Sequence, residues 1–259
     1  MIALIDADFI PWVVCHNKTL EDGTIEDKSL VECKALADDF INNTLKDTKS
    51  TGYLLFLTVG KCFRYDLNPQ YKIKRKGEKP KHFDGVKEHL IVKWGATYQP
   101  GYEADDLVLI YSKKVDNSFI VSPDKDLLNL VGQHYNPTKK EWIATSSNQA
   151  NYYFAKSMIV GDSADNIPGL KGKGEVYANK SLGELYGTKD LLTKVFSEYL
   201  NHFSSETEAI EEFYKMYKSL KILDSAEDVE IKVYKGIESE YESKKEVVAE
   251  PKIDIKQWD

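Results

Sequence analysis

Apolar runs and helical periodicities alternate over the first 145 residues. The run at 2–6 ends in Asp6 and has the composition of a strand buried on both faces, whereas 29–46 repeats its apolar positions with the period of a helix that begins at Ser29. The same patterns predict strands at 53–59 and 118–122, a hairpin of 134–136 with 141–145, and helices at 104–114 and 125–131. Strands that alternate with helices favour an α/β fold with a parallel sheet, in which ligands sit beyond the carboxyl ends of the strands.

The character of the chain changes after Ser147. Helical segments and glycine turns follow as far as about residue 221, and the remaining tail is charged, with one candidate strand at 229–234. The polar, basic stretch that begins at Arg64 has no clear period and is too long for a tight connection, so we interpret about 64–90 as a functional loop or arch. We therefore expect three parts: an α/β domain at 1–155, a helical region at 156–225 and a charged tail at 226–259.

Composition narrows the class of protein. Apolar residues make up 42% of the chain, which suffices for a core, and no apolar run approaches the ~20 residues of a membrane span. The first residues lack the basic region of a signal peptide, and the three cysteines are scattered, which favours a reducing compartment over a disulfide framework or a zinc site. We expect a cytoplasmic monomer without a membrane partner, located in the host cell if the chain is phage-encoded.

Charge is distributed unevenly along the chain. The net charge of −7 argues against a nucleic-acid partner, but residues 72–81 contain six basic residues and a single acid, Glu78. The only two arginines, Arg64 and Arg75, flank or lie in this stretch. Segregated charge of this kind suits a protein that binds metal in one place and phosphate beside it.

Acidic residues recur where the chain leaves apolar segments. They are Asp6, Asp8, Glu103, Asp105, Asp106, Asp124, Asp126, Asp162 and Asp165. For any single group the simpler interpretation is capping of the following helix, where carboxylates gain from the helix dipole. If all of them converge at one edge of the sheet, they stay ionised only with bound cations. Oxygen ligands without Cys or His select Mg²⁺ or Mn²⁺, and two such ions can activate water and stabilise the leaving oxygen of a phosphoryl displacement.

The basic stretch offers groups for a phosphate backbone. Lys72, Lys74, Arg75 and Lys76 supply positive charge, and Tyr71 supplies a ring that can stack on a base. A solvated basic loop explains the same residues equally well.

A glycine turn supplies a second candidate DNA contact. Gly172 and Gly174 allow a tight hairpin, and the helix expected from Glu175 adds its N-terminal dipole, so that exposed backbone N–H groups can bind phosphate. Lys171 and Lys173 strengthen this site. The pattern fits a grip on one DNA strand that does not depend on sequence, with a generic loop as the alternative.

These segments together resemble the phage and bacterial 5′-nuclease family, which comprises flap endonucleases and 5′→3′ exonucleases. The resemblance rests on Leu4-Ile-Asp6, Phe63-Arg64 with Tyr71-Lys72 and Arg75, Glu103-Ala-Asp105-Asp106, Ser122-Pro-Asp124-Lys-Asp126, and Gly161-Asp162 with Asp165-Asn-Ile-Pro-Gly169. These stretches occur in order between residue 2 and about residue 180. The resemblance implies a PIN-like (resolvase-like) α/β core, with a parallel sheet flanked by helices, followed by a helical helix–hairpin–helix (helix–three-turn–helix) DNA-binding region.

The same resemblance assigns roles to residues. It implies a first metal ion bound by Asp6, Glu103, Asp105 and Asp106, and a second bound by Asp124, Asp126, Asp162 and Asp165. Lys72 and Arg75 would act catalytically by steering the scissile phosphate. The implied DNA contacts are Arg64, Tyr71, Lys74, Lys76, Gly169, Lys171, Gly172, Lys173 and Gly174, and the hairpin would also bind K⁺ through backbone carbonyls. The implied activity is cleavage near DNA 5′ ends or flaps with two Mg²⁺ or Mn²⁺ ions, in phage DNA replication or recombination.

One position departs from the family pattern. The family places an aspartate after the second strand, where this chain reads Thr58-Val-Gly60, and Asp8 and Asp66 are the candidates to compensate. Three alternatives remain open. They are a haloacid-dehalogenase-type phosphatase, which Asp6-Ala-Asp8 resembles, a non-catalytic DNA-junction binder, and an RNA-cleaving PIN-type ribonuclease.

Overall fold

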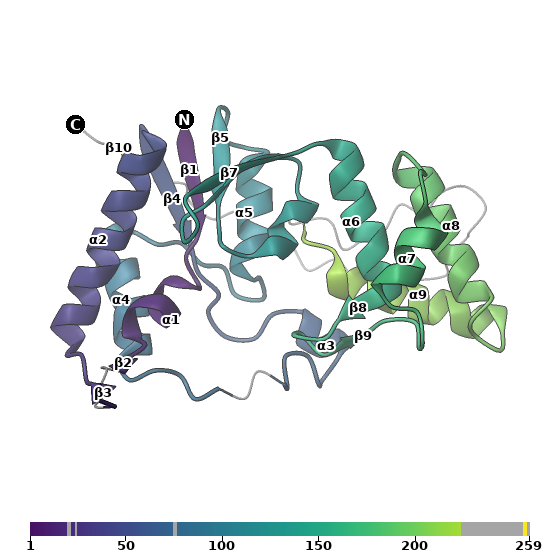
Figure 1. Ribbon diagram of the computed structural model, residues 1–259, viewed down its shortest axis with the longest axis horizontal. Helices are drawn as coiled ribbons and strands as arrows, with labels where there is room; N and C mark the ends of the chain where they lie inside the picture. The colour runs from purple at the N-terminus through teal and green to yellow at the C-terminus, as the bar shows by residue number, and fades with distance from the viewer. Residues whose placement is uncertain (20–21, 24, 75–76, 224–255, 258–259) are drawn as a thin grey trace.

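A central sheet organises the first half of the chain. The computed structural model describes residues 1–19, 22–23, 25–74, 77–223 and 256–257. Six strands lie in the order β10-β4-β1-β5-β6-β7 (Figure 1). Their bounds are β1 (Ile2–Asp6), β4 (Gly52–Phe56), β5 (Ser118–Val121), β6 (Gly132–Asn136), β7 (Glu141–Thr145) and β10 (Lys256–Gln257). The four inner strands are parallel and the two edge strands antiparallel, which confirms the predicted α/β class and the hairpin of β6 with β7.

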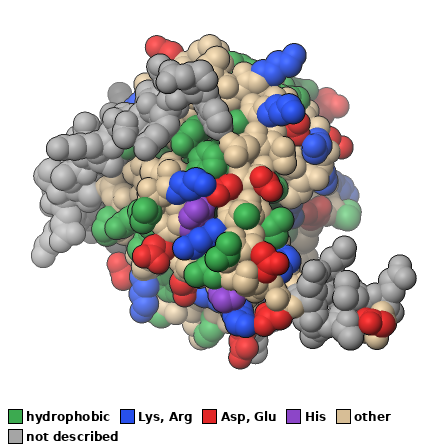
Figure 2. All heavy atoms as spheres, turned by 90° about the vertical axis from the view of Figure 1, so that its left-hand side faces the viewer, with side chains coloured by type: hydrophobic (Ala, Val, Ile, Leu, Met, Phe, Trp, Pro, Cys, Tyr) green, Lys and Arg blue, Asp and Glu red, His purple; other side chains and the backbone are tan. Residues whose placement is uncertain are grey.

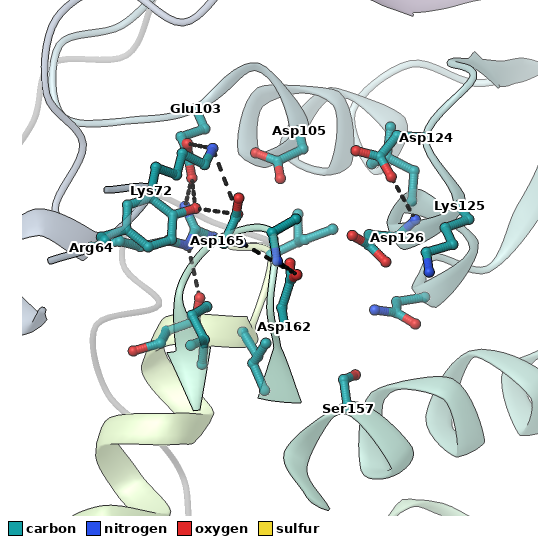
Figure 3. Close-up of a pocket in the computed structure, with 18 of the residues that line it drawn as sticks. Arg64, Lys72, Glu103, Asp105, Asp124, Lys125, Asp126, Ser157, Asp162 and Asp165 are labelled. Carbon is teal, nitrogen blue, oxygen red and sulfur yellow. Dashed lines mark hydrogen bonds and ion pairs between the residues drawn. The ribbon is translucent and has the colours of Figure 1, made fainter. Parts of the chain in front are cut away.

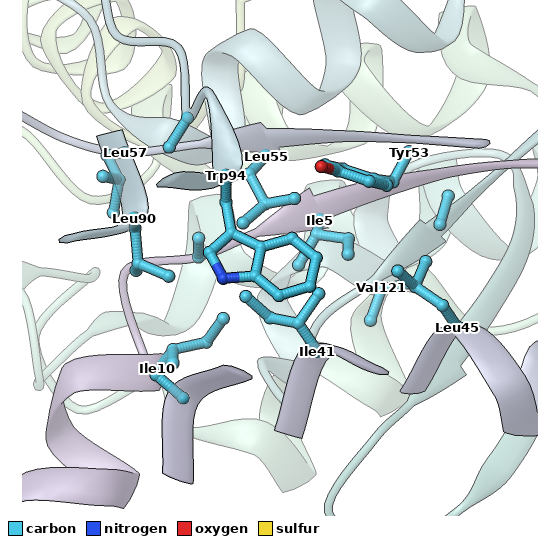
Figure 4. Close-up of a cluster of buried hydrophobic side chains, with 14 of the residues drawn as sticks. Ile5, Ile10, Ile41, Leu45, Tyr53, Leu55, Leu57, Leu90, Trp94 and Val121 are labelled. Carbon is cyan, nitrogen blue, oxygen red and sulfur yellow. The ribbon is translucent and has the colours of Figure 1, made fainter. Parts of the chain in front are cut away.

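Helices cover both faces of this sheet. One face packs on α1 (Ile10–Cys15), α2 (Leu30–Thr48) and α4 (Phe83–Trp94), and the other on α5 (Ala104–Ser112). Figure 4 shows the first of these layers, with Ile5, Leu55 and Val121 of the sheet against Ile41 and Trp94. Alternate residues of the same strands face α5, so each strand is buried on both sides and reads as a continuous apolar run.

Helix α2 begins where its sequence predicts. The Ser29 hydroxyl accepts a hydrogen bond from the Glu32 backbone N–H, and Glu32 reaches back to the Ser29 N–H, which completes a capping box. Asp38 of α2 then lies within hydrogen-bonding distance of three side chains of α4, those of His89, Lys93 and Trp94. This contact fixes α4 against α2. The α2–α4 side of the molecule carries acidic, basic and histidine side chains interspersed (Figure 2).

Two helices fall within the stretch interpreted as a functional loop or arch. Within about 64–90, the structure has α3 (Arg64–Leu67) at one end and α4 at the other, and residues 68–74 and 77–82 between them run along one edge of the molecule (Figure 1). The sequence did not predict α4, because its N-cap residue His82 has a left-handed backbone and makes no side-chain cap. The helix predicted at 125–131 is instead a 3₁₀ helix, η1 (Lys125–Asn129).

The second half of the chain is a helical region beside the open end of the sheet. Its elements are α6 (Ser147–Val160), the short pair β8 (Gly161–Asp162) and β9 (Ile167–Pro168), α7 (Glu175–Leu182), α8 (Thr188–Leu200) and α9 (Glu206–Leu220). These helices bury a separate apolar cluster around Leu191, Tyr199 and Phe213. Helix α6 runs unbroken across the predicted boundary at residue 155.

Two smaller elements complete the description. A hairpin of β2 (Lys18–Thr19) and β3 (Ile25–Glu26) follows α1. The candidate strand at 229–234 lies outside the described residues. Among the described helices, none combines the length and apolar composition that crossing a bilayer requires.

Candidate active site

A cavity of about 380 Å³ lies between the carboxyl ends of the strands and the helical region. Nine acidic residues line it: Asp6, Asp8, Glu103, Asp105, Asp124, Asp126, Asp162, Asp165 and Glu175. Seven of these are among the eight acids that the sequence singled out as metal ligands. Figure 3 shows Asp105 and Asp162 between a group formed by Glu103, Lys72 and Asp165 and a second group formed by Asp124 and Asp126. The predicted convergence of distant carboxylates on one site is therefore present in the fold.

The end of β1 places Asp6 at the floor of this cavity. One carboxylate oxygen accepts a hydrogen bond from the Ser122 hydroxyl at 3.0 Å, and the other accepts the Asp8 backbone N–H at 3.2 Å. Burial, followed by the charge of Asp8, raises the pKa of Asp6 to about 7. Asp6 is therefore a carboxyl group whose ionisation a nearby cation would favour.

The turn after β5 brings two more carboxylates to the rim. Asp124 caps η1 by accepting the Asp126 backbone N–H at 2.9 Å, as the helix-capping interpretation expects. Asp126 points into the cavity, where desolvation and the charges of Asp124 and Asp162 raise its pKa to about 6. Asp124 therefore caps η1 and also lines the cavity with Asp126, so the two interpretations of these acids hold together.

The β8–β9 turn contributes the acids on the side of the helical region. Asp162 accepts backbone N–H groups of Ala164 at 2.8 Å and Asp165 at 3.3 Å, which holds the turn closed. A Cβ atom at Gly169 would lie 2.2 Å from the carbonyl carbon of Val160, so only glycine allows β9 to approach the end of α6 this closely. Gly169, predicted as a DNA contact, therefore has a packing role in placing Asp162 and Asp165.

Arg64, which lines the cavity, and Asp106, which does not, form a buried ion-pair network. The Arg64 guanidinium contacts Asp106 twice at 2.8 Å and Glu103 at 2.9 Å, and it donates to the backbone carbonyls of Ser219 and Lys221. These five hydrogen bonds use all five N–H donors of an arginine. Arg64 is 3% exposed and Asp106 is fully buried. The prediction of Arg64 as a DNA contact is therefore wrong, because its side chain is buried against these partners. Asp106 stays a predicted metal ligand, since one oxygen from each of Glu103, Asp105 and Asp106 lies within 4.8 Å of the others, an arrangement that could hold a metal ion.

Tyr71 is also buried rather than available to a base. Its hydroxyl lies 2.8 Å from Glu103 Oε2 and 2.9 Å from Asp165 Oδ2, and only 3% of the residue is exposed. The predicted stacking role is wrong for this geometry. Tyr71 instead links the carboxylate that precedes α5 to the one in the β8–β9 turn.

Lys72 places a cationic side chain against two carboxylates of the cavity. Its ammonium contacts Glu103 Oε1 and lies 3.7 Å from Asp165 Oδ2, and its backbone N–H donates to the Asp165 carbonyl. Burial would raise the pKa of Glu103, but Lys72 and Arg64 together lower it. Arg75 and Lys76 lie outside the described residues, and Lys74 is exposed.

The glycine hairpin is exposed, with one exception. Lys171, Gly172 and Gly174 lie at the surface, and Gly174 precedes the first residue of α7. Lys173 instead donates to Glu198 of α8 at 2.6 Å, and its side chain is 16% exposed. Glu198 also accepts hydrogen bonds from Tyr177 and Ser181 of α7. Lys173 thus fastens the hairpin to α8 instead of projecting toward a ligand.

The donor set fits hard divalent cations. Among the described residues, those that line the cavity include nine acids and no cysteine or histidine. Desolvation, followed by the charges of Asp106 and Glu103, raises the pKa of Asp105 well above its ordinary value. With Asp6 and Asp126, three carboxyl groups therefore have raised pKa values, and a bound divalent cation would relieve this cost.

Asp8 occupies the place beside Thr58, where the sequence lacks an expected aspartate. It lines the cavity and accepts the Thr58 backbone N–H at 2.9 Å, whereas Asp66 is exposed in α3 and does not line the cavity. Sequence reasoning noticed Asp8 but gave no role to Ser122 as the partner of Asp6, to Glu175, or to Lys87 beside Asp8. Asp8 could be recognised from the sequence because it is a carboxylate two positions after Asp6. Lys87 could not be recognised, because the sequence did not predict α4, the helix that places it.

Known proteins share both sequence and fold with this chain. A family model described as the 5′-3′ exonuclease N-terminal resolvase-like domain matches residues 19–158. A 5′-3′ exonuclease of Aquifex aeolicus is 33% identical over 150 residues, which are 51% of this chain and 52% of that protein. A thermostable DNA polymerase I of Thermus thermophilus is 30% identical over 174 residues, which are 59% of this chain and 21% of that protein. The matches thus span about half of the first relative and about a fifth of the second.

The solved structures extend the likeness in fold to the helical region. The bacteriophage T5 D15 flap endonuclease, in a pseudo-enzyme-product complex with DNA and metal ions, superposes with a TM-score of 0.59 and 17% identity over 85% of this chain and 90% of that chain. At this identity the likeness concerns the fold, which is the PIN-like arrangement of a mostly parallel sheet flanked by helices. Because the family model covers more than half of its 259 residues, the chain belongs to the 5′-3′ exonuclease N-terminal resolvase-like domain family.

Proposed function

We propose that this chain is a divalent-metal-dependent 5′-nuclease that hydrolyses phosphodiester bonds near the 5′ ends or flaps of DNA. One observation supports this proposal above the others. Carboxylates from four separate stretches of the chain, around Asp6, Asp105, Asp124 and Asp162, line a single cavity at the carboxyl ends of parallel strands. Membership of a 5′-3′ exonuclease domain family makes nucleic acid the expected substrate class.

The proposed ligands form two groups around the cavity. Asp6, Glu103 and Asp105 would bind one Mg²⁺ or Mn²⁺ ion, and Asp124, Asp126, Asp162 and Asp165 a second. Bound there, such ions activate water and stabilise the charge of the leaving oxygen. The residues of the chain orient these groups. Ser122 fixes the Asp6 carboxylate at 3.0 Å, and the backbone of the β8–β9 turn fixes Asp162 at 2.8 Å.

Lys72 would bind the scissile phosphate. Its ammonium lies at the cavity beside Glu103 and Asp165, so a phosphate at this point would contact both the lysine and the ligands of the metal ions. Arg75 would assist it. The two residues would orient the reacting phosphodiester against the carboxylate cavity.

The exposed hairpin would bind the duplex part of the substrate. Lys171, Gly172 and Gly174 are exposed just before α7, so phosphates can approach their backbone N–H groups and the Lys171 side chain without base contacts. A K⁺ ion bound by the hairpin carbonyls belongs to the same proposal. We also propose a role in DNA replication or recombination, in a phage or another source, and the relative named DNA polymerase I supports this proposal.

A second candidate function is DNA-junction binding without cleavage. Thr58 stands where the family pattern has an aspartate, which removes one carboxylate from the cavity. Asp8 beside it favours the catalytic alternative, because it restores a carboxylate to the same wall.

A cleavage assay distinguishes these functions. The full chain is incubated with 5′-labelled flap and blunt duplexes, in DNA and in RNA of the same structure, with Mg²⁺, Mn²⁺ or EDTA. We expect metal-dependent product from DNA. Metal-independent binding without product, at high protein concentration and long times, would establish the non-catalytic binder, and preferential cleavage of RNA would establish a ribonuclease.

A pair of variants tests the ligand assignment. Asp124→Ala should lower cleavage by at least about 100-fold and leave DNA binding largely intact, because it removes a metal ligand rather than a DNA contact. Asp116→Ala is the matched control, since Asp116 is exposed and lines a different cavity. Normal turnover by Asp124→Ala would contradict the assignment.

A further inference from the structure

Lys87 of α4 lies in the wall between the carboxylate cavity and a second cavity. The second cavity, of about 540 Å³, shares Asp8, Thr58, Lys72 and Glu103 with the first. Lys87 lines the second cavity and Asp8 lines both. The two side chains therefore meet at the boundary through which the cavities adjoin.

The contacts of Lys87 make it the counter-ion of Asp8. Its ammonium donates to the Thr58 carbonyl and lies 3.5 Å from Asp8 Oδ1, and its side chain is 19% exposed. The same Asp8 oxygen accepts the Thr58 backbone N–H, so the carboxylate stays in place whether or not the lysine is paired with it. Within the residues that the structure describes, Oδ2 of Asp8 accepts no hydrogen bond.

Neighbouring elements restrict how far Lys87 can move. Helix α4 is fixed to α2 through Asp38, and the Lys87 ammonium lies 5.9 Å from the centre of the Phe83 ring. The exposed part of the side chain faces the second cavity, which is also lined by Lys79 and Lys72 and by the acids Asp84 and Glu88. Lys79 is paired with Asp84 at 2.9 Å within this cavity. Lys87 also lines the cavity, so its ammonium can contact a phosphate that binds there.

We propose that Lys87 exchanges partners, from Asp8 to a DNA phosphate in the second cavity, and that this exchange makes Asp8 available as an additional ligand for a divalent cation in the first. The inference rests on the proposed function for its substrate. A cation at Asp8 and the Lys87 ammonium compete for one carboxylate, so each weakens the binding of the other. A phosphate that draws Lys87 away therefore strengthens cation binding, and by linkage the cation strengthens phosphate binding to the same degree.

Mn²⁺ binding, measured without cleavage, tests this exchange. The full chain is titrated with Mn²⁺ while free Mn²⁺ is followed by electron paramagnetic resonance, alone and with a flap duplex whose junction linkages are phosphorothioates to suppress cleavage. Loss of one partly exposed ion pair should change the affinity by about three- to fivefold. Lys87→Met should therefore bind Mn²⁺ about three- to fivefold more tightly than the wild type without DNA, and DNA should raise its affinity less than it raises that of the wild type.

Three further variants distinguish the exchange from a general effect of charge. Lys140→Met removes an exposed lysine that is paired with Asp47 and lines neither cavity, and it should behave as the wild type. Asp8→Asn should weaken Mn²⁺ binding, and Lys87→Met should have no further effect in an Asp8→Asn background. The proposal is overturned if Lys87→Met leaves Mn²⁺ affinity unchanged, or if it has the same effect with and without Asp8. Because cleavage is not measured, the exchange can hold even if the chain proves to be a non-catalytic binder.

Discussion

Replacement of Arg64 by methionine distinguishes a structural arginine from a DNA contact. The sequence places Arg64 next to a basic stretch, whereas the fold buries it between Glu103, Asp106 and the end of α9. Arg64→Met keeps most of the apolar stem and removes the charge. If Arg64 is structural, the substitution destabilises the protein. If it binds DNA, the protein remains stable and loses affinity.

The expected loss follows from what methionine leaves behind. Five hydrogen bonds disappear, and Asp106 loses its cationic partner at a site with no solvent exposure. Breaking a buried ion pair on one side costs about 3–5 kcal/mol. For a protein of this size, the melting temperature should fall by about 10 °C. The Leu223 backbone N–H, which donates to Asp106 at 2.9 Å, should be exposed earlier in hydrogen exchange as the end of α9 detaches.

Urea unfolding followed by tryptophan fluorescence, in EDTA, measures this loss. Lys140→Met is the control, because Lys140 forms an exposed ion pair with Asp47 and should lose little stability. DNA affinity is measured on the same samples as a function of salt. A variant that unfolds like the wild type, yet binds DNA more weakly with a salt slope reduced by about one, would refute the structural role of Arg64.

Three further predictions concern the charged groups. Mn²⁺ must displace the proton of Asp6, whose pKa burial raises to about 7. The Mn²⁺ affinity should therefore rise by up to about tenfold per pH unit below pH 7 and level off above it. An equally steep profile for Asp6→Asn would contradict this. Burial would raise the pKa of Glu198, but its hydrogen bonds hold that pKa far below the usual 4.5. The stability that ionised Glu198 contributes is therefore present above pH 4.5 and is lost as the pH falls below 4.5. The difference in melting temperature between the wild type and Glu198→Gln should narrow over that range. Lys72→Ala should slow cleavage about 100-fold while weakening DNA binding much less, and equal losses in both would reduce Lys72 to a tether.

The sheet and its flanking helices could be predicted from sequence because their signals are local. The strands at 2–6 and 118–122 are buried on both faces, and Ser29 with Glu32 forms a capping box that the sequence displays directly. Helix α4 could not be predicted in the same way. It follows a prolyl, lysine-rich segment, begins at a left-handed residue without a side-chain cap, and is stabilised by Asp38 from a helix about fifty positions earlier.

The candidate site was predictable in its carboxylates but not in its basic and aromatic residues. Acids that follow parallel strands lie close together, because the carboxyl ends of those strands meet at one edge of the sheet. An α/β pattern in the sequence is enough to anticipate this. The burial of Arg64 and Tyr71 depends on partners far away in sequence, such as Ser219 and Asp165. No local pattern distinguishes them from the exposed Lys74.

The acids of the cavity fall into two groups, according to whether basic side chains of the chain neutralise their negative charge. The pKa of Glu103 is lowered, because the charges of Lys72 and Arg64 outweigh the effect of its burial. Asp6, Asp105 and Asp126 have raised pKa values, because burial and neighbouring carboxylates outweigh any compensation from the chain. A divalent ion gains most at carboxyl groups of the second kind, since it removes a repulsion that the fold maintains. The cavity should therefore bind metal first at these three, with Glu103 joining only as Lys72 turns to a phosphate. On this argument, metal and DNA strengthen each other's binding through the lysines.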